Sequence, residues 1–408
     1  MNKKTGERWQ MSNSDQSIAI VGAGPVGLSL ALALSKKNIP VEVFEKELSL
    51  PPEIRASTFH APTLEKMAQW GVIDQVLEKG NKVRSIQFWD RSQKKVLLNL
   101  DYDLIKSDTA YPFRLQCPQN VYAQTLVDHL KSNPLVKMHW GYKFTGLEES
   151  EQAVTASFAT KDGLHKKTSP LLCAADGSNS AIRQFLKIDF SGMTYIDRFL
   201  LIGTQLNLEE YYPNIAPVNY IFDPEEWVIV LNLKNLVRIV FQVPPEQEDA
   251  EALAKDNIKN KIWNFVGKKI PFPILHTSIY KVHQRVASQF KKGRCLLLGD
   301  AAHINNPASG MGMNSGIMDA ALLADKICDY LNTDREDSLL NYEKIRKAYA
   351  EDNIKSYTQK RYQDLSTKSQ EARQQRNENF ARMQNSPELA RDYLLKASML
   401  DYHGRTDY

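Results

Sequence analysis

Three short stretches of this chain place glycines and an acidic residue directly after an apolar run. The first carries Gly22, Gly24 and Gly27 as GxGxxG, followed by a segment rich in Leu and Ala, and Glu45 ends the next apolar run. A strand, a glycine turn and a helix bring backbone N–H groups to a pyrophosphate, and an acid ending the second strand binds ribose hydroxyls. This stretch therefore predicts a dinucleotide site. Its expected contacts are Gly22, Gly24, Pro25, Val26, Gly27, Glu45 and Lys46.

The second stretch is LLCAADGSNSAIRQFL, in which an apolar run ends at Asp176 and Gly177. Asp-Gly is also a common turn pair, and Arg183 in the same stretch could be a solvated surface charge. In the third, the run CLLLG leads to Asp300, and a bare loop from Pro307 to Gly316 follows. Asp300 could bind a ribose or ribityl chain, or it could cap a helix beginning just after it. A helix N-terminus after such a loop offers N–H donors to an anionic heterocycle.

Together, the three stretches resemble the para-hydroxybenzoate hydroxylase-like family of flavoprotein monooxygenases, from about Ser17 to Ala350. The resemblance implies FAD as cofactor and makes the loop Pro307 to Gly316, here called the flavin loop, the backbone that lies against the isoalloxazine ring. It also implies that Arg55 faces the FAD phosphates and that Gln119 contacts the flavin. The further FAD contacts it implies are Asp176, Gly299, Asp300, Pro307, Gly310, Gly312, Met313 and Asn314. Ala174 and Ser309 stand where the family usually has glycine, and MDAALLADKI lacks the family's tryptophan.

The reaction that the resemblance implies is reduction of the flavin by NADPH or NADH, formation of a flavin C4a-hydroperoxide with O2, and hydroxylation of a phenolic or related aromatic ring. The chain has one GxGxxG in a strand and helix context. The nicotinamide cofactor is therefore expected to bind transiently, without a Rossmann domain of its own. The alternatives are a monooxygenase that modifies drugs or natural products, and a quinone-biosynthesis hydroxylase.

Candidate residues for the substrate come from the segments between the motifs. His60 is a candidate for the proton path, because imidazole titrates near neutral pH, although a histidine at a helix start or in the core is the alternative. Arg114, Tyr220 and Arg238 could hold an anionic or phenolic substrate, or could be structural residues of the sheet. The residues expected to form the outer wall of the pocket, or simply its core, are Tyr220, Phe222, Trp227 and Phe241.

The fold class that follows is α/β, with a Rossmann-like FAD-binding domain, an interleaved antiparallel β-sheet substrate domain and a helical C-terminal region. Short apolar runs separated by Pro, Asn and Asp between Tyr195 and Pro245 indicate the second sheet. The predicted boundaries are a disordered extension at 1–15, an FAD-binding domain at 16–80, 106–185 and 286–345, a substrate domain at 81–105 and 186–285, and helices at 346–408. The amphipathic segment SPELARDYLLKASML is expected to be a packing or dimer element.

Composition excludes several other classes of protein. A net charge of +4 without a basic block gives no reason to expect nucleic acid, and no apolar run reaches the length of a membrane span. The four cysteines have neither metal spacing nor the redox pair of a disulfide reductase, and no tryptophans are placed as in a flavin halogenase. A carrier such as a GDP dissociation inhibitor would need no flavin, and the intact GDAAH and PASGMGMN argue against it. We therefore expect a cytoplasmic monomer or homodimer that binds no metal.

Overall fold

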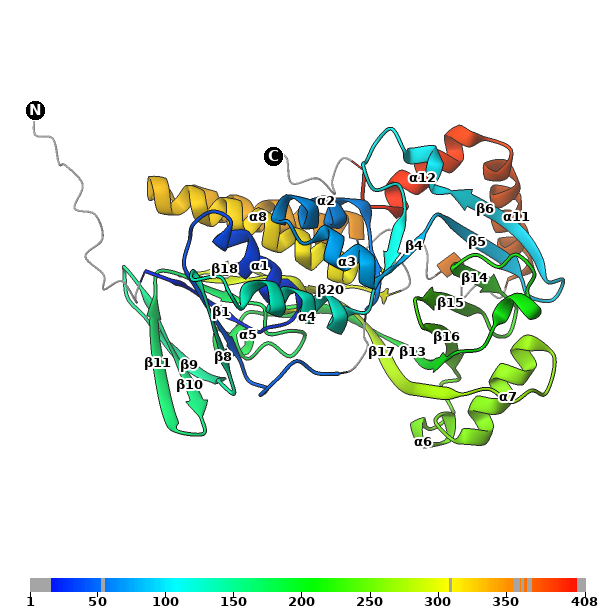
Figure 1. Cartoon of the computed structure of the whole chain (residues 1–408), viewed down its shortest axis with the longest axis horizontal. Coiled ribbons are helices and arrows are strands. Elements are labelled where there is room, and N and C mark those ends of the chain that lie inside the picture. The colour runs from blue at the N-terminus through cyan, green and yellow to red at the C-terminus, as the bar shows by residue number, and fades with distance from the viewer. Residues whose placement is uncertain are drawn as a thin grey trace, which may run out of the picture.

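The computed structural model describes residues 16–52, 56–307, 310–354, 360, 363–364 and 369–401. The predicted extension at 1–15, the predicted phosphate contact Arg55, and Ser309 lie outside the described residues. Two large sheets lie side by side along the long axis of the molecule, and helices from the end of the chain return over the second sheet (Figure 1). The predicted α/β class, with a helical C-terminal region, is confirmed.

The first sheet has six strands and contains the glycine motif. Its buried runs, such as IAIV, have no polar alternation, as is usual for parallel strands covered on both faces. The strands pair in parallel except for the edge pair β18 and β19. In order across the sheet they are β18 (Lys291–Lys292), β19 (Cys295–Leu297), β12 (Leu172–Ala174), β1 (Ile18–Val21), β2 (Val41–Glu45) and β8 (Val136–Trp140).

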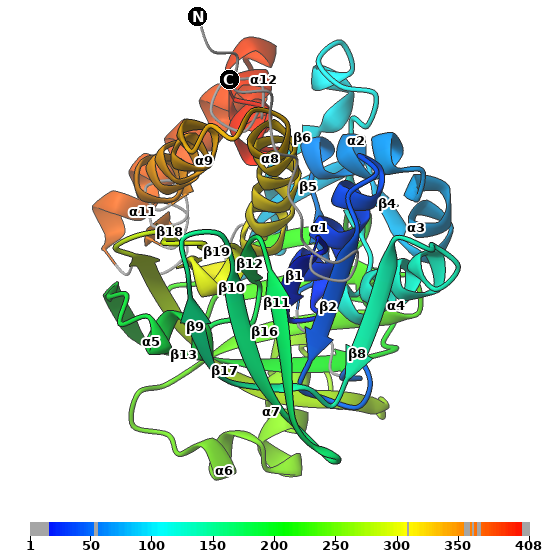
Figure 2. The same cartoon turned by 90° about the vertical axis from the view of Figure 1, so that its left-hand side faces the viewer.

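Helices cover one side of the first sheet (Figure 2). A three-stranded meander packs against another part of the same sheet. The helices are α1 (Pro25–Ser35), α4 (Gln119–Leu130), α8 (Gly312–Thr333) and α9 (Asp337–Ala348). The meander consists of β9 (Lys143–Glu149), β10 (Val154–Thr160) and β11 (Gly163–Ser169). Phe44 of β2 stacks on Phe158 of β10 with ring centroids 4.4 Å apart. The meander therefore shares the core of the first sheet.

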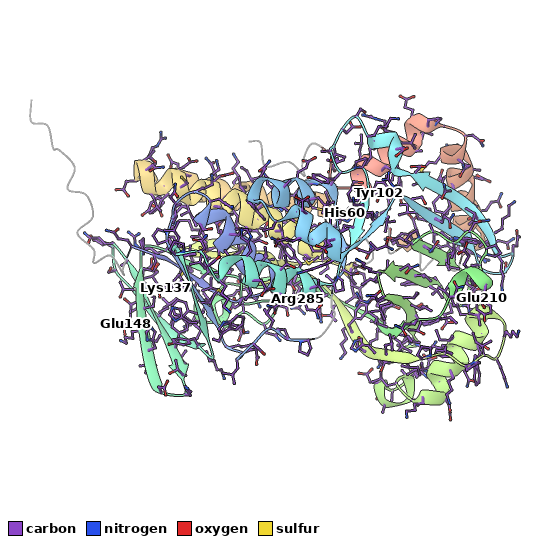
Figure 3. The ribbon with its side chains drawn as sticks, in the orientation of Figure 1. His60, Tyr102, Lys137, Glu148, Glu210 and Arg285 are labelled. Carbon is purple, nitrogen blue, oxygen red and sulfur yellow. The ribbon has the colours of Figure 1, made fainter. Side chains whose placement is uncertain are left out.

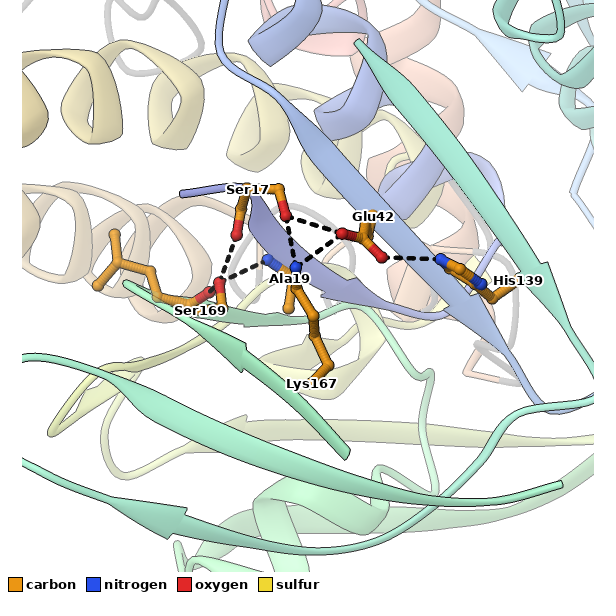
Figure 4. Close-up of polar contacts among 7 residues, drawn as sticks. Ser17, Ala19, Glu42, His139, Lys167 and Ser169 are labelled. Carbon is orange, nitrogen blue, oxygen red and sulfur yellow. Dashed lines mark hydrogen bonds and ion pairs between the residues drawn. The ribbon is translucent and has the colours of Figure 1, made fainter. Parts of the chain in front are cut away.

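A buried polar network also joins the meander to the first sheet (Figure 4). The Nζ of Lys167 donates to Glu42 Oε1 and to the Ser17 hydroxyl, each at 2.7 Å. His139 Nε2 lies 2.9 Å from Glu42 Oε2. Ser169 Oγ accepts from Ala19 N at 3.0 Å, which ties β11 to the first strand. Burial raises the pKa of Glu42, but the bonds from His139, Lys167 and Ser17 lower it to about 2.

The second sheet has eight strands, all antiparallel to their neighbours except β14 and β5, which run parallel. The long pair β13 and β17 extends toward the first sheet (Figure 1). In order the strands are β20 (His303–Ile304), β17 (Ile274–Ala287), β13 (Phe190–Thr204), β16 (Leu236–Val243), β15 (Val228–Leu233), β14 (Val218–Phe222), β5 (Ser85–Asp90) and β6 (Lys95–Asp101).

The two faces of the second sheet have separate cores. Helices α6 (Asp249–Ala252) and α7 (Lys255–Val266) belong with one face, where Phe241 packs on Phe265. The other face, called the site face below, carries Tyr220, Phe222 and Trp227 and is covered by α11 (Gln370–Gln384) and α12 (Pro387–Ala397). The expectation that Phe241 stands with these three aromatics is wrong, because alternate residues of β16 point to opposite faces.

Smaller elements connect the two sheets. A three-stranded sheet has the order β3 (Thr58–Phe59), β7 (Arg114–Gln116) and β4 (Asn81–Val83). The remaining elements are α2 (Ala61–Trp70), α3 (Ile73–Lys79), α5 (Ala181–Phe185), a π-helix at Tyr349–Ile354, and the 3-10 turns η1 (Tyr102–Ile105), η2 (Leu208–Glu210) and η3 (Gly299–Ala301). Among the described residues, no helix is long and apolar enough to cross a bilayer.

Candidate flavin and substrate site

The glycines of GxGxxG have different structural roles. Gly22 has a φ of 106°, and a Cβ there would lie 2.3 Å from the Ala175 carbonyl oxygen. A Cβ on Gly27 would lie 2.0 Å from the Gly22 oxygen. These two glycines therefore let the turn pack. By contrast, no atom of the described residues lies within 4 Å of a Cβ built on Gly24, the N-cap of α1. This space at a helix N-terminus suits a phosphate group.

Glu45 is held rigidly at the end of β2. Its Oε2 accepts from Ala23 N at 2.8 Å and its Oε1 from Glu47 N at 3.0 Å. The carboxylate thus bridges the glycine turn and the chain leaving β2, and each oxygen keeps a lone pair for a ribose hydroxyl. Lys46 beside it is exposed, with its Nζ 3.8 Å from a Glu47 oxygen.

The Gly299–Asp300 turn packs against the same helix start. Gly299 has a φ of 59°, and a Cβ on it would lie 3.0 Å from Val26 Cγ2. Gly316 of α8 lies next to Gly299, and a Cβ on Gly316 would approach Val26 Cγ2 to 2.6 Å and Gly299 Cα to 3.1 Å. Asp300 is exposed on this turn. The first and third motifs, distant in sequence, therefore meet at the side chain of Val26.

The segment predicted as a loop from Pro307 to Gly316 is helical from Gly312 onward, so the flavin loop includes the first turn of α8. Gly310 has a φ of 66°, and Gly312, the first residue of α8, faces open space, with no described atom within 4 Å of a built Cβ. The Asn314 amide donates to the carbonyl oxygens of Thr58 and Gly310, both at 2.8 Å. An α-helix leaves its first backbone N–H groups without intrahelical acceptors, so α8 directs donors into this space.

Asp176 and Gln119 are the remaining predicted flavin contacts. Asp176 Oδ2 accepts from Ile182 N at 3.3 Å, whereas its buried Oδ1 has no hydrogen-bond partner among the residues that the structure describes. Burial raises the pKa of Asp176, opposed by bonds from Ser180 and nearby backbone. Gln119 opens α4 and joins Ala56 through its backbone N–H at 2.8 Å. The orphaned Asp176 oxygen suits a ligand that donates a hydrogen bond.

Arg183 is not the solvated surface charge that the sequence left open. It is 5% exposed, and its guanidinium donates to the Ala301 carbonyl at 2.9 Å and to the Ser178 carbonyl at 2.8 Å. The second motif is thereby tied directly to the third. The open spaces at Gly24 and Gly312, the fixed acid Glu45 and the Asp176 oxygen together fit an extended dinucleotide carrying a heterocycle.

A buried charge cluster beneath the flavin loop was missed by the sequence analysis. Asp319 Oδ2 accepts from Gly299 N at 2.9 Å and lies 2.7 Å from His303 Nε2, while Arg346 Nε donates to Oδ1 at 2.6 Å. Arg346 also donates to the Ser315 hydroxyl at 3.0 Å. The cluster thus joins the Gly299 turn to Ser315 of the flavin loop. No local spacing signals it, because its members come from separate elements.

The three predicted substrate residues lie on or beside the site face. Arg114 is 2% exposed, and its guanidinium contacts the Tyr220 hydroxyl at 3.5 Å. Arg238, also 2% exposed, donates to the Ser57 hydroxyl at 3.3 Å. Thr58, next to Ser57, accepts the bond from Asn314 described above. Arg238 is thus connected to the flavin loop through the short segment of Ser57 and Thr58.

His60 belongs to that segment as well, near the junction of the two sheets (Figure 3). It is fully buried at the N-cap of α2, and its backbone N–H donates to Asn314 Oδ1 at 2.8 Å. This position agrees with the helix-start histidine considered from the sequence, and it also lies beside the flavin loop. The proton role of its imidazole stays a prediction.

Comparison with known proteins agrees with this geometry. The model of a family described as "FAD binding domain" matches residues 15–356. Para-nitrophenol 4-monooxygenase from Pseudomonas sp. (strain WBC-3) is 28% identical over 316 residues, covering 76% of this chain and 77% of the relative. The 6-hydroxy-3-succinoylpyridine 3-monooxygenase from Pseudomonas putida is 27% identical, covering 80% and 82%. The crystal structure of p-nitrophenol 4-monooxygenase from Pseudomonas putida superposes with a TM-score of 0.87 at 24% identity, covering 94% of this chain and 98% of that one.

The fold and the site therefore define a flavoprotein of the monooxygenase type. The chain belongs to the FAD-binding-domain family, and the predicted resemblance and FAD cofactor are confirmed.

Proposed function

We propose that this protein is an FAD-dependent monooxygenase that uses NADPH or NADH and O2 to hydroxylate a phenolic or related aromatic ring. The observation that carries the substrate class is the pair of buried guanidinium groups, Arg114 and Arg238, beside the segment that holds the flavin loop. A buried cation favours an anionic partner, such as a phenolate oxygen. FAD, when bound, supplies the transfer of electrons from the nicotinamide and the activation of O2.

The chain's own residues bind and activate the ring. Burial lowers the pKa of Arg238 to about 10, so its guanidinium is still protonated near neutral pH. A positive group beside a phenol lowers the pKa of that phenol and so favours the phenolate, the more nucleophilic form. The Tyr220 hydroxyl beside Arg114 can donate to the same oxygen. We assign Arg114, Tyr220 and Arg238 to substrate binding, and His60 to the proton path.

The site face also excludes water. Phe88 of β5 stacks on Tyr220 with ring centroids 5.3 Å apart, and Phe199 lies 5.2 Å from Trp227. An aromatic ring placed against such a surface is desolvated, and charge interactions with the arginines are stronger there than in water.

Small phenols or hydroxypyridines are favoured over larger natural products. The chain covers 77% and 82% of the nitrophenol and pyridine monooxygenases named above. It covers 58% of 6-methylpretetramide 4-monooxygenase from Streptomyces rimosus. Four free cysteines, three of them buried, support a cytoplasmic location. That the protein is a monomer or homodimer stays a prediction.

The test is aerobic oxidation of NADH and NADPH by the FAD-loaded protein, with phenols, anilines and hydroxypyridines as substrates and product masses recorded. Faster oxidation with a product one oxygen heavier is expected for a phenol. Arg114→Gln should raise KM for that phenol at least about tenfold, because a charged hydrogen bond is lost. Arg335→Gln is the matched control, since Arg335 is 73% exposed. Peroxide as the sole product with every compound would contradict the proposal.

A further inference from the structure

The last helices of the chain cover the site face. We call residues 369–401, which include α11 and α12, the C-terminal cap. The cap lies beyond the match to the FAD-binding family, which ends at residue 356. It packs on β6 and on η1 of the substrate side (Figure 1). The cap therefore packs largely on the substrate side of the molecule.

The first contact of the cap is with the aromatic residues of the site face. Phe380 of α11 lies 5.0 Å from Phe88 and 5.7 Å from Phe222, measured between ring centroids. The Arg376 guanidinium carbon lies 3.9 Å above the Phe222 ring centroid. Tyr393 of α12 meets Phe88 edge-on at 6.1 Å. The aromatic surface that includes Tyr220 thus continues into the cap.

The second contact is with the proposed substrate arginine. The Ala397 carbonyl oxygen lies 3.4 Å from one terminal nitrogen of Arg114, whose other terminal nitrogen contacts Tyr220. Leu394, one turn earlier, is fully buried in the same core as Tyr220. Arg114 is therefore enclosed by the sheet on one side and by the end of α12 on the other.

The third contact is with the flavin loop. Met399 is 1% exposed and packs in a small cluster with Met311 and Tyr349. Met311 belongs to the flavin loop and is the N-cap of α8. Polar bonds anchor the outer side of the cap, with Arg391 2.6 Å from Asp108 and Gln384 Oε1 3.0 Å from Asn99 N. The cap thus extends from the aromatic sheet, past Arg114, to the flavin loop.

We propose that the C-terminal cap is a wall of the substrate site and selects aromatic substrates by size, with Leu394 as the residue that limits the ring's bulk. The proposal rests on the proposed hydroxylase function and extends it to substrate size. In a hydrophobic pocket, one methylene changes discrimination by roughly 10 to 200-fold. Shortening Leu394 should therefore favour a bulkier phenol, and enlarging it should exclude that phenol.

The experiment compares kcat/KM for 4-phenylphenol with kcat/KM for phenol in the FAD-loaded full-length chain. The ratio is independent of the concentration of active enzyme, so partial unfolding of a variant does not change it. Leu394→Ala should raise the ratio at least about tenfold, and Leu394→Phe should lower it. Leu394→Val is a milder variant with the same expected direction as Leu394→Ala. Leu389→Ala is the control on the same helix, because Leu389 is 48% exposed, and its ratio should match the wild type.

The proposal is overturned if the Leu394 variants that fold keep the wild-type ratio within about twofold, or if Leu389→Ala changes it equally. Failure of the proposed function is recognised separately. In that case the wild-type protein converts neither phenol nor any other aromatic compound to a product one oxygen heavier.

Discussion

Arg346 donates from its Nε to Oδ1 of Asp319 at 2.6 Å, and both side chains are almost completely buried. The pair joins α9 to α8 at the flavin loop, because Arg346 also donates to the Ser315 hydroxyl. Asp319 accepts in addition from the Gly299 backbone. Burial raises the pKa of Asp319, but the charges of His303 and Arg346, together with the hydrogen bonds, lower it to about 2. Asp319 is therefore ionised at neutral pH and orients the Gly299 turn.

Asp319→Asn should destabilise the protein by about 3 to 5 kcal/mol, because it leaves the Arg346 guanidinium buried without a counter-charge. Urea unfolding of the FAD-loaded protein at pH 7 measures the change. Asp325→Asn on the same helix is the control, since Asp325 is 46% exposed in its pair with Lys37, and about 1 kcal/mol or less is expected. Equal losses of unfolding free energy in both variants would show that the buried pair stabilises the protein no more than the exposed pair does.

Asp300→Ala should fold but fail to keep FAD through purification, because the exposed carboxylate beside α8 is the expected ligand of the FAD ribityl chain. The ratio of flavin to protein absorbance and an FAD titration report the loss. Asp162→Ala, at an exposed turn between β10 and β11, should keep full occupancy. Full FAD occupancy in Asp300→Ala would remove Asp300 from the site.

Two glycine substitutions should separate binding from folding. Gly24→Val adds a side chain in the space that no described atom fills, so the variant should fold and bind FAD at least about tenfold more weakly. Gly27→Val brings a Cβ to 2.0 Å from a backbone oxygen, so little soluble protein is expected. Circular dichroism and FAD titration test both. A Gly24→Val protein with wild-type affinity would place the pyrophosphate elsewhere.

Acid should weaken the network around Glu42. Its pKa is lowered from 4.5 to about 2, so the ionised carboxylate stabilises the fold fully above about pH 4.5, and this contribution disappears as the pH falls toward 2. Glu42→Gln should lower the free energy of unfolding at pH 7 by up to about 3 kcal/mol, which corresponds to the pKa shift of Glu42. The substitution also leaves the buried Lys167 without its carboxylate partner. The difference in unfolding free energy between wild type and Glu42→Gln should be smaller at pH 3 than at pH 7. A difference independent of pH would contradict this account.

His60→Gln tests the proton path. If the imidazole carries a proton from the substrate, the pH dependence of kcat should lose a step near neutral pH. A histidine that only packs at the start of α2 would lower stability and leave the pH profile unchanged. Thermal unfolding and the kcat profile between pH 5.5 and 9 therefore separate the two roles.

The flavin motifs were predictable because their constraints are local. A positive φ at Gly22 and close contacts at Gly27 require glycine whatever the rest of the chain does. The apolar runs that lead to Glu45 and Asp300 predicted strands, and the structure has Glu45 as the last residue of β2 and Asp300 three residues after β19. The face of the second sheet on which Phe241 lies was not predictable. Alternation along a strand puts neighbouring residues on opposite faces of the sheet, but it does not say which face meets the flavin.

The amino-acid sequence by itself determined the α/β class, the FAD motifs and the chemistry they suit, because glycine turns, apolar periodicity and helix starts act over a few residues. Only the tertiary structure decided which distant groups meet. Arg114 contacts Ala397 from across most of the chain, and Asp319 reaches Arg346 and Gly299 from separate elements. Such pairs form because burial of charge demands a partner, and the packing of sheets and helices selects which partner is near.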